Sequence, residues 1–151
     1  MSPCEACWRR LPVVDRSILA KKIAAIRDAA ARIEAVLPST ADAFVADRTA
    51  REVVSFNLFL ALQEAISLAA HWLADEGAEV PATYGEVFAA LGARGVIDPT
   101  LTARLRAAAG LRNLIAHQYG VLDFRRVFAV ARDDQADLLA FCQQLAARAG
   151  E

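Results

Sequence analysis

Apolar residues at helical spacing between residues 47 and 74 constrain the fold more than any other feature of the chain. They are Val53, Val54, Leu58, Leu62, Ala65, Ile66, Ala69, Trp72 and Leu73. This spacing is typical of a helix with a wide buried face, so we predict a central helix over these residues. Glu64 interrupts its richest part, 53–73, and the chain has no run of 18 apolar residues. We therefore expect no membrane-spanning helix.

Three more long helices and one short helix follow from the same period and from start and stop signals. The expected ranges are 14–37, with Asp15 as cap and Pro38 as stop; 84–91; 98–120, opened by Asp98 and Pro99; and 123–149, which Asp133 and Asp134 can bend or interrupt. The stretches 38–44, 75–86 and 92–100 are interpreted as turns or loops. The composition, 56% hydrophobic with 7 glycines and 5 prolines, favours packed helices. We predict an all-α, up-and-down bundle of four long helices and one short helix.

The N-terminal segment lies outside this bundle. Residues 1–12 are predicted to be a flexible appendage, and residues 13–151 to be one helical domain. Cys4 and Cys7 form a C-x-x-C without a second pair, so a tail or an upstream start is favoured over a zinc or redox site. Three cysteines cannot all pair within one chain, and the N-terminus lacks a secretory apolar segment. We therefore expect a cytoplasmic protein.

The stretch RNLIAHQYG, residues 112–120, places unusual polar chemistry at a helix end. On a helical wheel, Arg112 falls within the apolar arc of the helix that follows Pro99. A guanidinium cannot lose its proton, so on that arc it needs a partner or a cavity. One interpretation is an arginine that reaches the helix rim or pairs with a buried acid such as Glu64. The other is a functional arginine.

A second, polar stripe on the same helix collects Arg106, Gly110, Asn113 and His117. A glycine inside a helix costs up to about 1 kcal/mol relative to alanine, so Gly110 suggests a close approach by another helix. Because this stripe faces away from the apolar core, that helix can belong to a second subunit. Arg112 and His117 are five residues apart, which is the wrong spacing for a zinc pair on one face. Two copies of the helix meeting across a twofold axis can still form a shared site, although a lone helical histidine is more often structural.

The charge of the whole chain does not indicate a nucleic-acid partner, but the charge of one segment is consistent with one. The net charge of −1 gives no general electrostatic case. Between residues 101 and 132, however, there are six arginines against one acid, Asp123. This is either a basic surface around the motif or a solvated helix face whose acids come from other segments.

The segment from Arg112 to Tyr119 resembles the R-x4-H-x-Y signature of the HEPN superfamily, in its HepT-like (DUF86) toxin branch. The flanking stretches IDPTLTARLRAAAGL and GVLDFRRVF, and the upstream NLFLALQEAISLAAHWLA, extend the resemblance over roughly residues 14–145. It implies a helical bundle that dimerises through the motif helix. It also implies a metal-independent endoribonuclease without a cofactor, the toxin of a toxin–antitoxin pair. The implied partner is an MntA-like minimal nucleotidyltransferase antitoxin that AMPylates Tyr119.

The residue types suit this chemistry. RNA carries its own nucleophile, the 2′-hydroxyl, so its cleavage needs proton transfer and stabilisation of a charged phosphorane. His117 is suited to transfer the proton, Arg112 to hold the phosphate, and Asn113 to orient the phosphate or the imidazole. AMP on Tyr119 would add bulk and negative charge where RNA must enter.

Two questions remain open in the sequence. Asn57, Glu64 and His71 recur every seven residues on one side of the central helix, where they either support the site or are satisfied as buried polar groups. A non-catalytic binding module for a nucleotidyltransferase or a nucleotide is the alternative function. A purely structural bundle ranks last because it leaves Arg112 unexplained.

Overall fold

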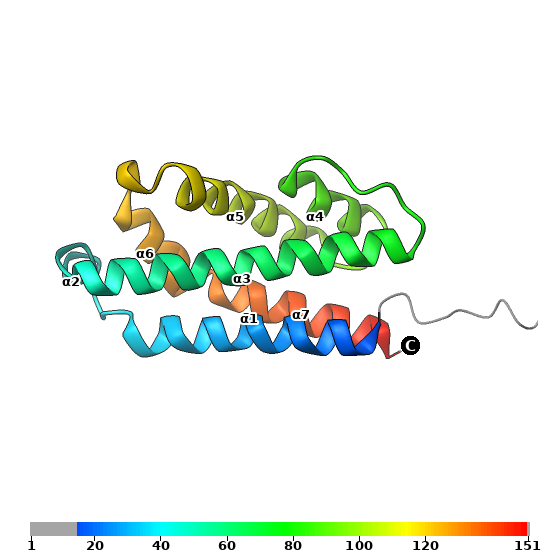
Figure 1. The fold of residues 1–151 in the computed structure, drawn as a ribbon, viewed down its shortest axis with the longest axis horizontal. Coiled ribbons are helices and arrows are strands. Elements are labelled where there is room, and N and C mark those ends of the chain that lie inside the picture. The colour runs from blue at the N-terminus through cyan, green and yellow to red at the C-terminus, as the bar shows by residue number, and fades with distance from the viewer. Residues whose placement is uncertain (1–14, 151) are drawn as a thin grey trace, which may run out of the picture.

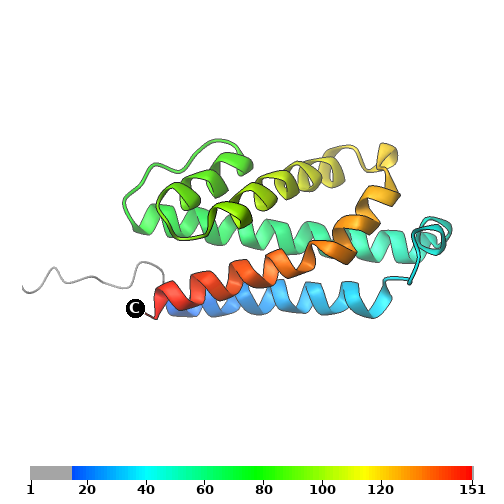
Figure 2. The ribbon, with the colours of Figure 1, turned by 180° about the vertical axis from the view of Figure 1, so that it is seen from behind.

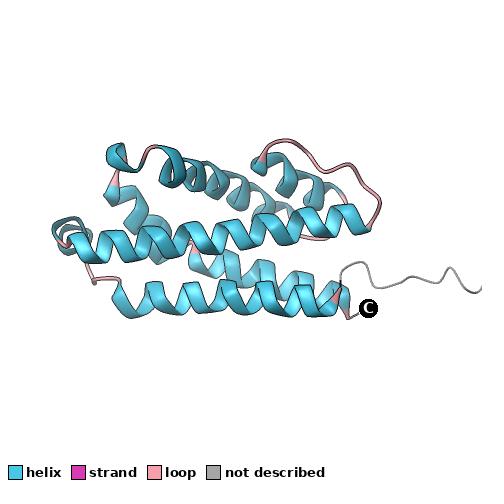
Figure 3. Ribbon diagram, viewed as in Figure 1, coloured by secondary structure: helices cyan, strands magenta, loops and turns pink. Residues whose placement is uncertain are grey.

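The computed structural model describes residues 15–150, and every regular element in that range is a helix (Figures 1 and 3). In chain order these are α1 (Arg16–Val36), α2 (Ala41–Ala46), α3 (Arg48–Asp75), α4 (Tyr84–Ala93), α5 (Pro99–His117), the 3-10 helix η1 (Tyr119–Val121), α6 (Phe124–Asp133) and α7 (Gln135–Ala149). The all-α bundle expected from the sequence is therefore confirmed. The expected appendage, residues 1–12 with Cys4 and Cys7, falls outside the described residues.

Helix α3 lies at the centre of the bundle, as its apolar sequence predicts. Helix α1 runs alongside it, α4 and α5 cover a second side, and α6 and α7 cover a third (Figures 1 and 2). By length and composition alone, α3 is the one described helix that reaches the size of a membrane span. More than half of its most apolar window is buried inside the bundle, as in the core helix of a helical protein.

Two hydrophobic clusters share the length of α3. One gathers around Trp72, Phe88 and Phe141, with the Phe88 and Phe141 rings edge to face at 5.8 Å. The other gathers around Phe44 and Phe128 at the end where α5 reaches its C-terminus. The motif segment of α5 packs on this second cluster.

The helix starts follow from capping. The Asp15 carboxylate accepts a hydrogen bond from the Ser17 amide at 2.7 Å, and Asp98 accepts one from the Leu101 amide at 2.8 Å. Pro99 occupies the first turn of α5, where its missing N–H costs nothing. The predicted starts of these two helices are therefore confirmed.

The described range contains seven α-helices instead of five, because one helix was not expected and one anticipated interruption occurs, and α5 ends earlier than expected. The stretch 38–44 was expected to be a turn, but Ala41–Ala46 forms α2, capped by Thr40 and anchored by the fully buried Phe44. The last long helix is divided at Asp133 and Asp134 into α6 and α7. Helix α5 ends at His117 instead of 120, because the chain tightens into η1.

Candidate active site

Arg112 is held by side chains from three helices. Its Nε and Nη2 both donate to Oε1 of Gln63 on α3, at 3.0 and 2.7 Å. Its Nη1 donates to Oδ1 of the neighbouring Asn113 at 3.2 Å. The guanidinium also lies over the rings of Phe59 and Tyr84, at 5.0 and 4.6 Å from their centroids. Aromatic faces attract a cation, so this half-buried group is oriented without a counter-charge.

Glu64, one of the alternatives considered for Arg112, is not its partner. Glu64 instead faces α1, where Oε2 accepts from Nζ of Lys22 at 3.1 Å. Within residues 15–150, no carboxylate forms an ion pair with Arg112. A guanidinium has five N–H donors, and this one uses three of them on side chains in residues 15–150. Two donors and the positive charge of Arg112 are therefore left for a ligand. An anion such as a phosphate suits this arrangement.

The polar stripe of α5 is exposed along its length, at Arg106, Gly110, Asn113 and His117. A Cβ added at Gly110 would meet nothing within 4 Å, so no helix in the described part of this chain crosses there. The close helix approach lies instead at Gly92 on α4, where an added Cβ would fall 2.3 Å from Oγ1 of Thr102. The sequence argument did not anticipate Gly92. Any helix that crosses at Gly110 is therefore not one of those in residues 15–150.

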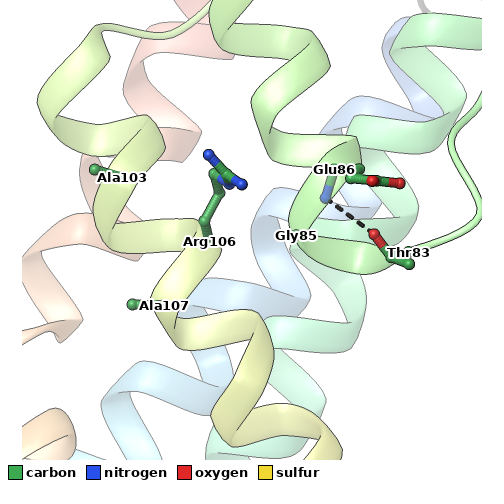
Figure 4. A pocket seen from close by; sticks show the side chains of 6 residues that line it. All are labelled: Thr83, Gly85, Glu86, Ala103, Arg106 and Ala107. Carbon is green, nitrogen blue, oxygen red and sulfur yellow. Dashed lines mark hydrogen bonds between the residues drawn. The ribbon is translucent and has the colours of Figure 1, made fainter.

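Arg106 stands apart from the other motif residues, near the first turn of α4 (Figure 4). It lines an open pocket of about 530 Å³ with Thr83, Gly85, Glu86, Ala103 and Ala107. Among the side chains drawn there, the hydrogen bond is the cap from the Glu86 amide to Oγ1 of Thr83, at 3.4 Å. Arg106 therefore contributes a positive charge to this pocket and not to the hydrogen bonds that hold Arg112.

His117 and Tyr119 occupy the end of the motif. His117 is the last residue of α5 and is exposed. Tyr119 follows in η1, 38% exposed, with its ring edge to face against Phe124 at 5.8 Å. The shift from α-helix to 3-10 helix at Gln118 turns the tyrosine away from the straight path of α5. The structure thus brings Arg112 and Asn113 into direct contact, with His117 further along the same helix.

The supporting residues proposed on α3 do not gather around Arg112. Asn57 is buried and its Nδ2 donates to the Val53 carbonyl of its own helix at 2.8 Å. Glu64 points to α1, and His71 is exposed. The residues that do support Arg112 are Gln63, Phe59 and Tyr84. Their one signal in the sequence is that Phe59 and Gln63 are four residues apart, on one face of the central helix.

Other reactive groups give little competing chemistry in the described residues. Burial raises the pKa of the Cys142 thiol to about 11, so it is protonated and unreactive at neutral pH. No group of three or more histidine, cysteine, aspartate or glutamate side chains in residues 15–150 is arranged to hold a metal ion.

Comparison with known proteins defines the class. A family model described as "Ribonuclease HepT-like" matches residues 26–145, most of the chain. The chain therefore belongs to the HepT-like family of the HEPN superfamily, and the resemblance carried by residues 112–119 is confirmed.

Among individual relatives, a curated protein of Archaeoglobus fulgidus named "Putative RNase" is 32% identical over 92 residues, covering 61% of this chain and 69% of the relative. The HEPN toxin of Shewanella oneidensis, in a tri-AMPylated form bound to an MNT antitoxin, is 27% identical with a TM-score of 0.79. That match covers 86% of this chain and 97% of the toxin. A toxin–antitoxin crystal structure with AMP-PNP gives 26% identity and a TM-score of 0.81 over 87% of this chain and 98% of that chain.

Proposed function

We propose that this protein is a metal-independent endoribonuclease that acts as a homodimer and as the toxin of a toxin–antitoxin pair. The observation that carries the proposal is Arg112, whose guanidinium is oriented by neutral groups and keeps two free donors. A structural arginine on an apolar helix face is ordinarily paired with an acid. The similarity to a curated relative named as an RNase supports the same chemistry.

In this mechanism the RNA supplies the attacking oxygen. His117 takes the proton from the 2′-hydroxyl, and the 2′-oxygen forms a bond to the adjacent phosphorus. The bond from phosphorus to the 5′-oxygen breaks, which leaves a 2′,3′-cyclic phosphate and a 5′-hydroxyl. A protonated imidazole from the second copy, or water, returns a proton to the leaving oxygen. Arg112 stabilises the charge that grows on the phosphorane, and the free amide nitrogen of Asn113 helps to orient it.

The dimer brings two such sets together. The exposed stripe of α5 is lined by small residues as well as polar ones, and at Gly110 it has room for another backbone. Two copies of α5 that cross there place the His117 and Arg112 side chains of both copies on a shared cleft. Arg106 lies on the same face and adds positive charge along the path of the RNA.

The antitoxin in this proposal is a minimal nucleotidyltransferase that transfers AMP to the Tyr119 hydroxyl. Two structures with similar folds support it, an AMPylated HEPN toxin with an MNT antitoxin and a toxin–antitoxin complex with AMP-PNP. Tyr119 is exposed enough to accept the group. An AMP there adds bulk and a negatively charged phosphate at the end of the motif, which would repel the incoming RNA.

The ribonuclease is tested with His117→Ala and with His71→Ala as its control, because both histidines are exposed and only one belongs to the motif. Purified proteins are incubated with single-stranded RNA in EDTA. We expect wild type and His71→Ala to cleave, and His117→Ala to lose activity by about 100-fold or more. Equal activity of all three would refute the assignment of His117 and would favour a non-catalytic binding module.

AMPylation is tested by intact mass after co-expression with a minimal nucleotidyltransferase of the MNT type. The expected adducts are whole AMP groups that disappear in Tyr119→Phe. Tyr84→Phe is the matched control, since Tyr84 is partly buried at the start of α4. An unchanged adduct pattern in Tyr119→Phe would refute the modified residue.

A further inference from the structure

An aromatic groove opens directly beside the end of the motif helix. It has a volume of about 430 Å³ and is lined by Glu52, Phe56, Phe59, Ile115, Ala116 and Tyr119. Phe56 is 59% exposed, an unusual cost for a phenylalanine in a bundle whose other large side chains are mostly covered. Ala116 and Tyr119 flank His117 in the sequence, so the groove adjoins the proposed site of proton transfer.

No arginine lines the groove itself, but three arginines lie close to its lining residues. Arg48 pairs with Glu52, Nε to Oε1 at 2.9 Å. The hydrogen bond and the charge of Glu52, with a smaller contribution from Tyr119, raise the pKa of Arg48. Arg51 lies over the Phe124 ring at 4.8 Å, and its buried Nε has no hydrogen-bond partner in residues 15–150. Arg112 lies over Phe59, one of the groove's own walls. An apolar groove with arginines nearby suits a planar nucleobase, because the base can stack on the aromatic rings while the arginines bind the anionic phosphates on either side of it.

We propose that this groove binds one nucleobase of single-stranded RNA next to the linkage that is cut. The inference rests on the proposed ribonuclease function and adds a subsite that positions the substrate. Phe56 and Tyr119 provide the stacking faces, and the neighbouring arginines bind the phosphates on either side. An apolar protein segment is a poorer fit, because it would leave the neighbouring arginines without anions.

Glu52 gives the groove a base preference. Its Oε1 is engaged by Arg48, and Oε2 is left to accept a hydrogen bond from a base edge. Cytosine, adenine and guanine carry an exocyclic amino group that can donate to a carboxylate, whereas uracil offers only a ring N–H, which lies between its two carbonyl groups. We therefore expect the groove to favour the three amino-bearing bases over uracil.

The binding test uses a short 2′-O-methyl RNA, which cannot be cleaved, with a fluorescent end label. Oligomers that carry one abasic position, moved along the strand, are compared by anisotropy. We expect one position at which base removal weakens binding to wild type by about 5- to 100-fold, the range of one lost stacking contact. In Phe56→Ala this positional effect disappears, and Phe56→Tyr restores it. Leu139→Ala is the control, because Leu139 is also exposed but lies on α7.

The kinetic test uses cleavable RNA of the same sequence. Phe56→Ala is expected to raise KM with a smaller effect on kcat, and Glu52→Gln to reduce the preference against uracil at the identified position. An abasic scan with no sensitive position would overturn the subsite even if wild type cleaves RNA. A sensitive position without any cleavage would instead overturn the ribonuclease and keep the subsite. If Phe56→Ala turns dimers into monomers at constant concentration, the groove is a subunit interface and the inference is wrong.

Discussion

Gly110→Ala separates the stability of one protomer from the stability of the proposed dimer. Gly110 lies inside α5 and is exposed, and a methyl group added to its Cα would have nothing within 4 Å. Alanine is favoured over glycine in a helix interior by about 0.5–1 kcal/mol, so the free energy of unfolding of the protomer should rise by that amount. If a second α5 crosses at this point, the same methyl forces two backbones apart.

The expected loss in association follows from the twofold symmetry. Overpacking at a close contact costs about 1–3 kcal/mol, and a symmetric interface holds two copies of the substitution. The minimum cost of about 2 kcal/mol corresponds to a dimer dissociation constant about 30-fold higher. Sedimentation velocity over a range of concentrations measures this constant, and urea unfolding at low concentration measures the protomer. Ribonuclease activity per protomer should fall in the concentration range where the variant dissociates.

Gly92→Ala is the matched control. Its added methyl overlaps Thr102, whose hydroxyl is tied by a 2.8 Å hydrogen bond to the Asp98 carbonyl and so cannot move freely away. This variant should lose about 1–3 kcal/mol of stability, with no direct effect on association. A Gly110→Ala protein that is more stable but dimerises as tightly as wild type would refute the crossing at Gly110. If Gly110→Ala made the protomer less stable, the open space around Gly110 would be refuted.

Further predictions concern the core, the junction between α6 and α7, and Gln63, which holds Arg112. Phe44→Ala should cost about 3–5 kcal/mol in urea unfolding, because its ring is fully buried against Phe128; an effect below about 1 kcal/mol would show that α2 is not anchored there. Burial, with the nearby Asp137 charge, raises the pKa of Asp134. Ionisation of Asp134 therefore destabilises the native state, and the stability that the protonated carboxyl contributes is lost as the pH rises through the folded pKa. Asp134→Asn should therefore be more stable than wild type at pH 7, with the difference vanishing below about pH 3.9 in unfolding measured against pH. Gln63→Glu should keep the unfolding midpoint but lower kcat on RNA by about 100-fold, since a carboxylate would neutralise Arg112; unchanged kcat would refute the need for a free charge.

The long helices were predictable because their apolar period repeats over many turns. Helix α2 was not, since its six residues make fewer than two turns and leave no period to detect. Its Thr40 cap was visible in the sequence, but the preceding Pro38 and Ser39 also fit a turn. What fixes α2 is the burial of Phe44 under α6, a contact between segments far apart in the chain. No local pattern carries that information.

The site was predictable in its residue types but not in the partner of Arg112. The wheel correctly placed Arg112 toward the interior, and the stripe through Asn113 and His117 is exposed as expected. Charge neutralisation made Glu64 one candidate partner, but one residue along a helix rotates the side chain by about 100°. Gln63 therefore faces α5 while Glu64 faces α1. Only the rotation of α3 relative to its neighbours decides between them, and that rotation is set by packing.

The neutral partner is also what lets Arg112 serve the proposed chemistry. An acid at the anchor would orient the guanidinium equally well, but it would offset the charge that a phosphorane needs. An amide oxygen orients it through two hydrogen bonds and leaves the charge in place, while the faces of Phe59 and Tyr84 stabilise the cation where water is partly excluded. Lysine could not replace it, because a single ammonium cannot hold the Gln63 oxygen with two donors in a plane and still present others to RNA. The same physics therefore explains both how a charged residue is tolerated on the apolar arc of α5 and why that residue is an arginine.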